Sequence, residues 1–271
     1  MKQFVVIGNP INHSLSPNLH NYVYKSLKID AEYKKKKVST KDLPQLMDGI
    51  RNGDLSGVNV TIPHKEVIMQ YLDEINPRAN NIGAVNIVYK DGSKLIGNNT
   101  DWYGFLMALK SNDIEIFEKE VLVLGAGGVS KSILYALKQL GVKKIILLNR
   151  TLEKAVQLQD NLVHALPLTE SVQMIKNDSI LINTTPIGMQ SKKSPIDLGL
   201  INKNQTLIDI IYNPFETAML KFGKKIGAKT LNGLDMFIHQ GLISMDLWFG
   251  KDISKQVNYN EIKTYLKNII C

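Results

Sequence analysis

The sequence predicts an α/β protein of two domains, the second built on a doubly wound parallel sheet. Three observations support this fold class. The chain has 271 residues, more than most single compact domains. Strand and helix patterns alternate from residue 3 onward, as in α/β units. An apolar strand at 121–124 runs into a glycine-rich turn and a long helical pattern, which is typical of a nucleotide-binding β-α-β unit.

In the first half, strand patterns near 3–8, 32–38, 56–62 and 85–89 alternate with helical patterns near 16–28, 41–52 and 64–72. Asp91-Gly92 predicts a hairpin turn. A helix is expected from Asp101 to about 112, followed by an acid-rich connection at 113–120. In the second half we expect strands at 121–124, 144–148, 179–182, 206–209 and 228–230 with helices between them. Two final helical patterns end near 249 and 270, and periodicity alone leaves open where they pack.

Composition describes an ordinary globular protein, with 44% hydrophobic and 21% charged residues. No stretch is long enough to span a bilayer, and the first residues enter a strand pattern rather than a signal peptide. Cys271 is the single cysteine, so no internal disulfide or cysteine-based metal site is possible. We therefore expect a cytoplasmic protein without a membrane partner.

The net charge of +8 suits nucleic acids, membranes or small anions. The lysine run at 34–37 lies in a strand pattern, which would place successive lysines on opposite faces. A solvated edge strand is the better interpretation, because lysines there deter edge-to-edge pairing. With no nucleic-acid motif present, we expect a small-molecule substrate and no nucleic-acid partner.

The segment 59–65 carries the first candidate site. Asn59 and Thr61 alternate with apolar residues, so that one face would enter a core while the amide and hydroxyl line a cleft. Pro63 suits the first position of a helix over 64–72. Lys65 would then lie in the partial positive charge of a helix N-terminus. The expected core face consists of Val58, Val60 and Ile62.

The glycine turn predicts a dinucleotide site. Gly125 allows a tight turn, Gly127 lets the main chain approach a pyrophosphate, and the following helix directs its N–H groups at the anion. Ser130 replaces the third glycine, and a small serine still permits close helix–strand packing. The polar loop at 183–189, which includes Thr184, follows another strand and would border the nicotinamide, although a purely structural turn is the alternative.

The end of the second strand favours NADP over NAD. NAD-binding units usually carry an acid there, whereas this chain has Asn149, Arg150 and Thr151, with Lys154 one turn later. Arg150 would bind a 2′-phosphate and Lys154 would add charge. Thr151 would cap the helix and donate a hydrogen bond. A capped helix with solvated basic residues is the structural alternative.

Further polar segments lie at 12–17, 83–86, 98–104, 209–214 and 232–240. Together with 59–65, the glycine turn and Asn149-Arg150-Thr151, they resemble the NADP-dependent shikimate dehydrogenase family over nearly the whole chain. The resemblance implies a substrate domain at 1–101 completed by 236–271, a Rossmann-type NADP domain at 102–235, and a cleft between them. It also implies a monomer or homodimer. The implied reaction is reversible NADPH-dependent reduction of 3-dehydroshikimate to shikimate in aromatic amino-acid biosynthesis.

The resemblance also implies residue roles. Ser14 and Ser16, with Tyr212, would bind the substrate carboxylate, and Lys65 and Asp101 would form the catalytic pair. The ring hydroxyls would be surrounded by Asn59, Thr61, Asn86, Asp101 and Gln240. The implied NADP contacts are Gly125, Ala126, Gly127, Gly128, Val129, Asn149, Arg150, Thr151, Lys154, Ile210, Gly233 and Met236. Ile210 departs from family members that carry methionine there.

The implied hydride transfer needs no metal, and the histidines have no metal-ligand spacing. His64 neighbours Lys65 but would not share its helix face, so we expect a structural or rim position. Three alternatives stay open: a relative that also uses quinate, a methylenetetrahydrofolate dehydrogenase, and a non-catalytic NADP-sensing module. The serine pair and 98–101 favour a polyhydroxylated carboxylate over a folate, and Lys65 with Asp101 favours an enzyme.

Overall fold

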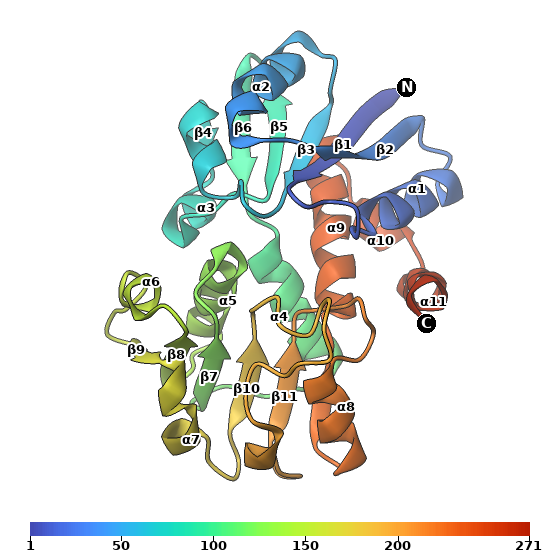
Figure 1. Ribbon diagram of the computed structural model, residues 1–271. Coiled ribbons are helices and arrows are strands. Elements are labelled where there is room, and N and C mark those ends of the chain that lie inside the picture. Colours follow the sequence, from blue (N-terminus) through green and yellow to red (C-terminus); the bar gives the residue numbers. More distant parts are fainter. The chain divides into compact units, whose positions relative to one another are not determined.

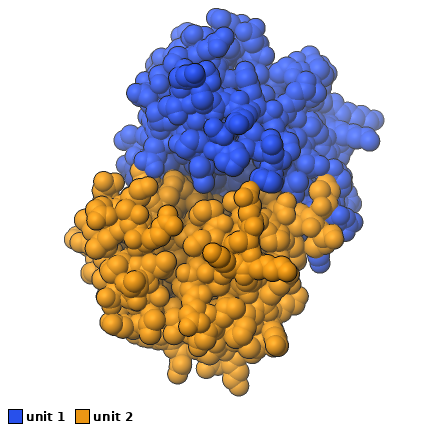
Figure 2. Space-filling model, in the orientation of Figure 1, with its two compact units in different colours: residues 1–104, 238–268 blue, residues 105–237, 269–271 orange.

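The computed structural model describes residues 1–271, and the chain divides into two compact units. Unit 1 comprises residues 1–104 and 238–268, and unit 2 comprises 105–237 and 269–271 (Figure 2). The chain enters unit 2 inside helix α4 (Asp101–Ser111) and leaves it inside helix α9 (Leu234–Phe249) (Figure 1). None of the helices combines the length and apolar character that a membrane span requires.

Unit 1 contains a mixed six-stranded sheet in the order β2-β1-β3-β5-β6-β4. Its strands are β1 (Lys2–Gly8), β2 (Ala31–Lys37), β3 (Gly57–Val60), β4 (Glu74–Ile75), β5 (Ile87–Asp91) and β6 (Lys94–Asn98). β1 is parallel to β2 and β3, whereas β5 is antiparallel to both β3 and β6. The predicted hairpin joins β5 to β6, and the lysine-rich β2 is an edge strand as predicted.

Helices cover both faces of this sheet. The helices of unit 1 are α1 (Ser16–Ser26), α2 (Leu43–Asn52), α3 (Pro77–Ile82), α10 (Ile253–Gln256), α11 (Tyr259–Ile270) and the second part of α9, with 3₁₀ turns η1 (Thr40–Asp42) and η2 (Val67–Tyr71). Alternation along β3 sends Val58 and Val60 into a core with Met47 of α2. Gly57 lies on the α9 face, where an added Cβ would come within 2.3 Å of Trp248. The alternating strand pattern therefore selects α2 for one face and α9 for the other.

The predicted helix over 64–72 is wrong. β3 ends at Val60, and the N–H of His64 donates to the carbonyl of Thr61 at 2.9 Å, closing a turn that holds Pro63. Only the 3₁₀ turn η2 follows. The carbonyl of Lys65 accepts from the Val85 N–H at 2.8 Å, and this tertiary bond replaces the helical one. Lys65 therefore lies in a turn, outside any helix N-terminus.

The same turn leaves the side chain of Ile62 exposed to solvent. This residue was expected on the core face with Val58 and Val60, yet it is 53% exposed. The alternation that would have buried it holds only while the strand continues, and the strand has already ended.

Unit 2 contains six parallel strands in the order β12-β11-β10-β7-β8-β9. The strands are β7 (Glu120–Leu124), β8 (Lys144–Asn149), β9 (Val163–Pro167), β10 (Ile180–Asn183), β11 (Thr206–Asp209) and β12 (Lys229–Leu231). The helices are α5 (Gly128–Gln139), α6 (Leu152–Val156), α7 (Ser171–Met174) and α8 (Ala218–Lys225), with 3₁₀ turns η3 (Leu168–Glu170) and η4 (Leu198–Leu200). The strand order reverses direction at β7, so the doubly wound prediction is confirmed, and polar loops follow the strand ends there.

Candidate active site

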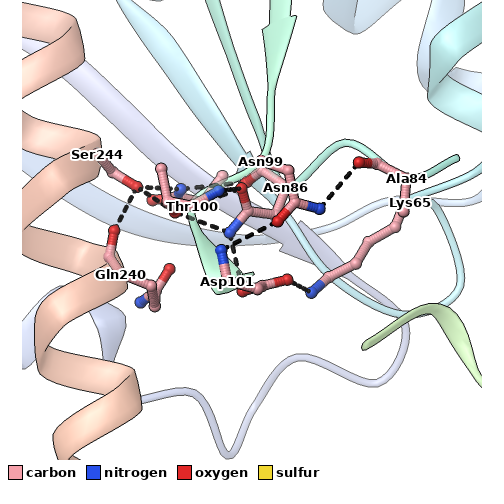
Figure 3. Close-up of polar contacts among 9 residues, drawn as sticks. Lys65, Ala84, Asn86, Asn99, Thr100, Asp101, Gln240 and Ser244 are labelled. Carbon is pink, nitrogen blue, oxygen red and sulfur yellow. Dashed lines mark hydrogen bonds and ion pairs between the residues drawn. The ribbon is translucent and has the colours of Figure 1, made fainter. Parts of the chain in front are cut away.

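Lys65 and Asp101 form a buried ion pair in unit 1 (Figure 3). The lysine Nζ lies 2.5 Å from Oδ2 of the aspartate, and their side chains are only 9% and 8% exposed. Lys65 lies in the turn after β3, whereas Asp101 is the first residue of α4. Two charges removed from water are costly unless further hydrogen bonds satisfy each partner.

Two asparagines hold Asp101, one through its carboxylate and the other through its main-chain N–H. Asn86 donates from Nδ2 to Oδ1 of Asp101 at 2.9 Å, and the Asp101 N–H donates to Oδ1 of Asn99 at 3.0 Å. Asn99 is itself held, because its Nδ2 donates to the Ala84 carbonyl at 2.8 Å (Figure 3). One carboxylate oxygen is thus fixed by Asn86 and the other is directed at Lys65.

A chain of hydroxyls extends from Asn86 to α9. Asn86 donates to Oγ1 of Thr100 at 2.9 Å and accepts from the Thr100 N–H at 2.7 Å. Oγ1 of Thr100 lies 3.2 Å from Oγ of Ser244, which in turn donates to the Gln240 carbonyl at 2.8 Å. Gln240 and Ser244 are one helical turn apart and lie near Thr100 in Figure 3.

Asn59 joins the same network from β3. Its Nδ2 donates to the carbonyl of Asn86 at 3.2 Å and to Oγ of Ser244 at 3.1 Å. Its Oδ1 accepts from Oη of Tyr33 at 2.7 Å. Asn59 is 5% exposed, so the predicted cleft-facing amide is largely buried among these partners.

The predicted serine pair lies at the start of α1. Oγ of Ser14 is 3.1 Å from Oγ of Ser16 and also accepts from the Ser16 N–H at 3.2 Å. Neither serine caps the helix, because Leu15 occupies the N-cap position and no side chain makes a capping bond there. Thr61 is partly exposed and its Cγ2 lies against Gly8, where an added Cβ would come within 2.6 Å.

His64 is fully buried and structural. Its Nε2 lies 2.9 Å from the carbonyl of Val38 and must donate to it, since a carbonyl only accepts. The expected structural role is confirmed, but a rim position is wrong. Nowhere does the chain bring together a group of His, Cys, Asp and Glu side chains that could hold a metal ion.

Hydrogen bonds made by Ser130 and Thr184 stabilise the glycine-rich turn of unit 2. Gly125 has a φ of +105°, which favours glycine, and Gly127 is exposed with no atom within 4 Å of an added Cβ. Oγ of Ser130 accepts from the Gly127 N–H at 3.0 Å. It also lies 2.7 Å from Oγ1 of Thr184, which donates its proton to the Leu124 carbonyl, so Ser130 is the donor to Thr184. The open main chain at Gly127 fits a pyrophosphate.

Asn149 ties this turn to the basic segment. Its Oδ1 accepts from the Ala126 N–H at 3.2 Å, and its Nδ2 donates to the Thr151 carbonyl at 2.7 Å. Arg150, Thr151 and Lys154 are exposed. Thr151 occupies the N-cap position of α6 as expected, but its side chain makes no capping bond, and the Lys154 N–H donates to the Thr151 carbonyl.

Asp209 connects two loops at the ends of β10 and β11. The buried carboxylate accepts from Nδ2 of Asn183 at 3.1 Å, from the Ile211 N–H at 3.1 Å and from Oγ1 of Thr217 at 2.8 Å. Burial raises the pKa of Asp209 to about 6, and these hydrogen bonds oppose the rise. The loops at 183–188 and 210–217 are therefore held together by one acid.

The remaining predicted residues of unit 2 lie beside these loops. At Gly233 an added Cβ would come within 1.9 Å of the Ile210 carbonyl oxygen, so only glycine fits. Tyr212 stacks on Phe237 with ring centroids 4.4 Å apart. Met236 is buried in the first turn of α9.

Sequence reasoning identified five of the residues gathered in unit 1: Asn59, Lys65, Asn86, Asp101 and Gln240. It missed four members of the network: Tyr33, Asn99, Thr100 and Ser244. Ser244 follows Gln240 by four residues and so shares its helix face, a signal that would have found it. Tyr33 gave no such signal, because it lies in the lysine-rich strand.

Comparison with known proteins adds an independent finding. The family model described as shikimate dehydrogenase substrate binding domain matches residues 6–88, and that described as shikimate / quinate 5-dehydrogenase matches 107–210. Shikimate dehydrogenase (NADP(+)) of Bacillus cereus (strain AH187) is 46% identical over 261 residues, which cover 93% of this chain and 94% of that protein.

Solved structures agree. The crystal structure of shikimate dehydrogenase from Aquifex aeolicus has a TM-score of 0.90 and 36% identity, covering 98% of each chain. Shikimate 5-dehydrogenase from Thermus thermophilus, in complex with NADP(H) and shikimate, has a TM-score of 0.86 and 33% identity, covering 99% of each chain.

Proposed function

The chain belongs to the shikimate dehydrogenase family, and we propose that its buried Lys65–Asp101 pair catalyses the reversible, NADPH-dependent reduction of 3-dehydroshikimate to shikimate. This reaction is a step of the shikimate pathway of aromatic amino-acid biosynthesis. The observation that supports this proposal is the ion pair itself. Nζ of Lys65 lies 2.5 Å from Oδ2 of Asp101, both side chains are nearly inaccessible to solvent, and Asn86 fixes the other carboxylate oxygen. Lysine and aspartate are almost never buried unless they are paired, so a pair buried among polar side chains fits a specific role for both.

Lys65 is the proton donor in this mechanism. Reduction of the ketone places negative charge on its oxygen, and the ammonium group of Lys65 stabilises that charge and transfers a proton to it. NADPH, when bound, supplies the hydride to the carbonyl carbon. Lys65 then recovers a proton from solvent. In the oxidation of shikimate, neutral Lys65 removes the proton of the reacting hydroxyl.

Asp101 orients the donor. With Oδ1 fixed by Asn86, its Oδ2 holds one N–H of Lys65 and leaves two N–H bonds of the ammonium group for substrate. The carboxylate also stabilises the positive charge of Lys65 before the proton is transferred. We assign Asp101 a second contact, to a substrate hydroxyl beside the reacting carbon.

The substrate-binding domain is assigned to 1–101 completed by 236–271. Ser14 and Ser16, whose hydroxyls lie 3.1 Å apart, would bind the substrate carboxylate together with Tyr212. The ring hydroxyls would contact Asn59, Thr61, Lys65, Asn86, Asp101 and Gln240. The network that joins Asn59 to Asp101 supports a common role for these side chains.

NADP would be held by the domain at 102–235. The open main chain at Gly127 precedes the N-terminus of α5, which suits a pyrophosphate, and the exposed Arg150 and Lys154 suit a 2′-phosphate. The other contacts assigned to the cofactor are Gly125, Ala126, Gly128, Val129, Asn149, Thr151, Thr184, Ile210, Gly233 and Met236. The backbones of Gly233 and Ile210 lie against each other, so these two residues would form one wall of the cofactor site.

We assign the protein to the cytoplasm, which suits a chain whose single cysteine is its exposed last residue. A monomer or a homodimer is proposed for its assembly. Cell fractionation tests the compartment, and light scattering on the purified protein tests the assembly.

One assay tests the function and its rivals. The purified protein is offered shikimate or quinate with NADP or NAD, and formation of reduced cofactor is followed by absorbance. We expect turnover of shikimate with NADP. Comparable turnover of quinate would identify a dual-substrate enzyme, and the absence of activity in every combination would contradict the proposed function.

A further inference from the structure

We propose that Tyr33 and Ser244 are positioning residues that lock the amide of Asn59 so that it offers the substrate only a hydrogen-bond acceptor. This inference rests on the proposed function, in which Asn59 contacts a ring hydroxyl. It adds two residues that act through Asn59 rather than on the substrate. It also predicts that the site selects substrate groups that donate a hydrogen bond to Asn59.

The orientation of the Asn59 amide follows from its neighbours. Its Nδ2 lies 3.2 Å from the carbonyl oxygen of Asn86, which is only an acceptor, so the nitrogen rather than the oxygen must face it. Oγ of Ser244 lies 3.1 Å from the same Nδ2. Both N–H bonds of Asn59 therefore have partners inside the protein.

Ser244 must accept from Asn59. A serine hydroxyl has one proton, and Ser244 donates it to the Gln240 carbonyl at 2.8 Å. Its oxygen is consequently an acceptor toward Nδ2 of Asn59 and toward Oγ1 of Thr100 at 3.2 Å. Ser244 is fully buried, so water does not compete for these bonds.

Tyr33 fixes the other end of the amide. Its Oη lies 2.7 Å from Oδ1 of Asn59, and because that oxygen only accepts, the tyrosine donates. The ring is stacked on His20 with centroids 4.0 Å apart, and Asn21 bonds both the N–H and the carbonyl of Tyr33 at 2.9 Å. A phenol held this firmly leaves Asn59 one unused lone pair and no unused proton.

Asn86 has the same restriction. One of its N–H bonds goes to Oγ1 of Thr100 and the other to Oδ1 of Asp101, while its Oδ1 accepts from the Thr100 N–H. Both asparagine amides assigned to the ring hydroxyls are thus acceptors. A substrate hydroxyl that contacts either asparagine must therefore donate its proton. A substrate analogue with fluorine in place of such a hydroxyl lacks the proton and loses the bond.

Two buried tyrosines of the same aromatic cluster provide a matched experiment. Tyr33→Phe removes the hydroxyl that bonds Asn59, whereas Tyr24→Phe removes a buried hydroxyl that has no hydrogen-bond partner. We expect Tyr33→Phe to raise the KM for shikimate about tenfold, with kcat and the KM for NADP changed less than about threefold. Tyr24→Phe should leave all three constants unchanged.

A second readout separates positioning from general loosening of the fold. Wild-type protein should discriminate against shikimate analogues in which one ring hydroxyl is replaced by fluorine, and Tyr33→Phe should reduce that discrimination for one of them, because the Asn59 oxygen is no longer held in place by the phenol. Ser244→Ala, which removes the acceptor on the other side of Asn59, should act in the same direction. It also serves if Tyr33→Phe does not fold.

The outcomes are distinct. If wild-type protein does not oxidise shikimate, the proposed function itself fails. If it does, but the KM for shikimate and the fluorine discrimination of Tyr33→Phe and Ser244→Ala equal those of wild type, the positioning role is overturned. It is equally overturned if Tyr33→Phe and Tyr24→Phe change the kinetic constants and the melting temperature alike.

Discussion

Asn86 donates a hydrogen bond from Nδ2 to Oδ1 of Asp101 over 2.9 Å, which leaves only Oδ2 to face Lys65. The acid of the pair is therefore oriented by a neutral side chain that cannot itself titrate. Removing any one of these three groups leaves the other two buried and incompletely bonded. The first two predictions follow from that arrangement.

Lys65→Ala should lower kcat about 10²- to 10⁴-fold, the usual scale for a positioned acid or base, with a smaller change in KM. Steady-state kinetics with shikimate and NADP measures both constants. Lys94→Ala is the matched control, because that lysine belongs to the same unit but forms an exposed ion pair with Glu74. A kcat equal to that of wild type in Lys65→Ala would refute the role of the lysine.

Lys65→Ala and Asp101→Ala should be non-additive. Either single change leaves an unpaired buried charge, at a cost of roughly 3–5 kcal/mol in unfolding free energy, whereas the double variant leaves none. The double variant should therefore lose less stability, and less kcat, than the two singles together. Denaturant unfolding and kinetics on all four proteins measure the coupling, and strict additivity in both would mean that the two groups act independently.

Arg150→Asp should raise the KM for NADP at least tenfold and change that for NAD far less, because an acid repels a 2′-phosphate and accepts bonds from ribose hydroxyls. Lys203→Asp, at an exposed position of the same unit, makes the same change in net charge and is the control. If Arg150→Asp left the affinity for NADP unchanged, the assignment of Arg150 to the 2′-phosphate would be refuted.

Asp209 should make the protein less stable as pH rises from about 4 to 6. Burial raises its folded pKa from 3.8 to about 6, so in this window the folded state binds the extra proton and unfolding becomes easier as pH increases. Relative to Asp209→Asn, wild-type protein should lose roughly 2 kcal/mol across that range, from a total of about 3 kcal/mol over the whole titration at 1.36 kcal/mol per unit of pKa. Denaturant unfolding of both proteins at pH 4, 5, 6 and 7 measures the difference.

The comparison with Asp209→Asn is needed because other acids act in the opposite direction. Hydrogen bonds from Arg51 lower the pKa of Asp73. Ionisation of Asp73 therefore increases the stability of the folded protein as pH rises from acid values. A difference between wild type and Asp209→Asn that stays constant from pH 4 to 7 would contradict the prediction.

Sequence patterns predicted the features that depend on local order. The parallel sheet around β7, the hairpin at Asp91-Gly92 and the lysine-rich edge strand follow from apolar runs, turn residues and alternation. The pairing of Lys65 with Asp101 did not come from periodicity. It came from the resemblance, because the two residues are 36 positions apart and no local pattern joins them.

The failures occurred where long-range contacts decided the structure. Pro63 and the apolar spacing after it indicated a helix, but the bond from Val85 to the Lys65 carbonyl imposed a turn. Ser244 lies 185 positions from Asn59, in an apolar helix without any motif. Tyr33 looked like one residue of a basic strand, and only the packing against His20 shows why it is aromatic.

The hydrogen bonds that hold Asn59, Asn86 and Asp101 form entirely within unit 1. These side chains have therefore already lost their rotational freedom when the chain folds. Immobilising a flexible side chain during association typically costs about 0.5–1.5 kcal/mol, and that cost is largely absent here. Substrate association should accordingly show a small entropic penalty from side-chain ordering.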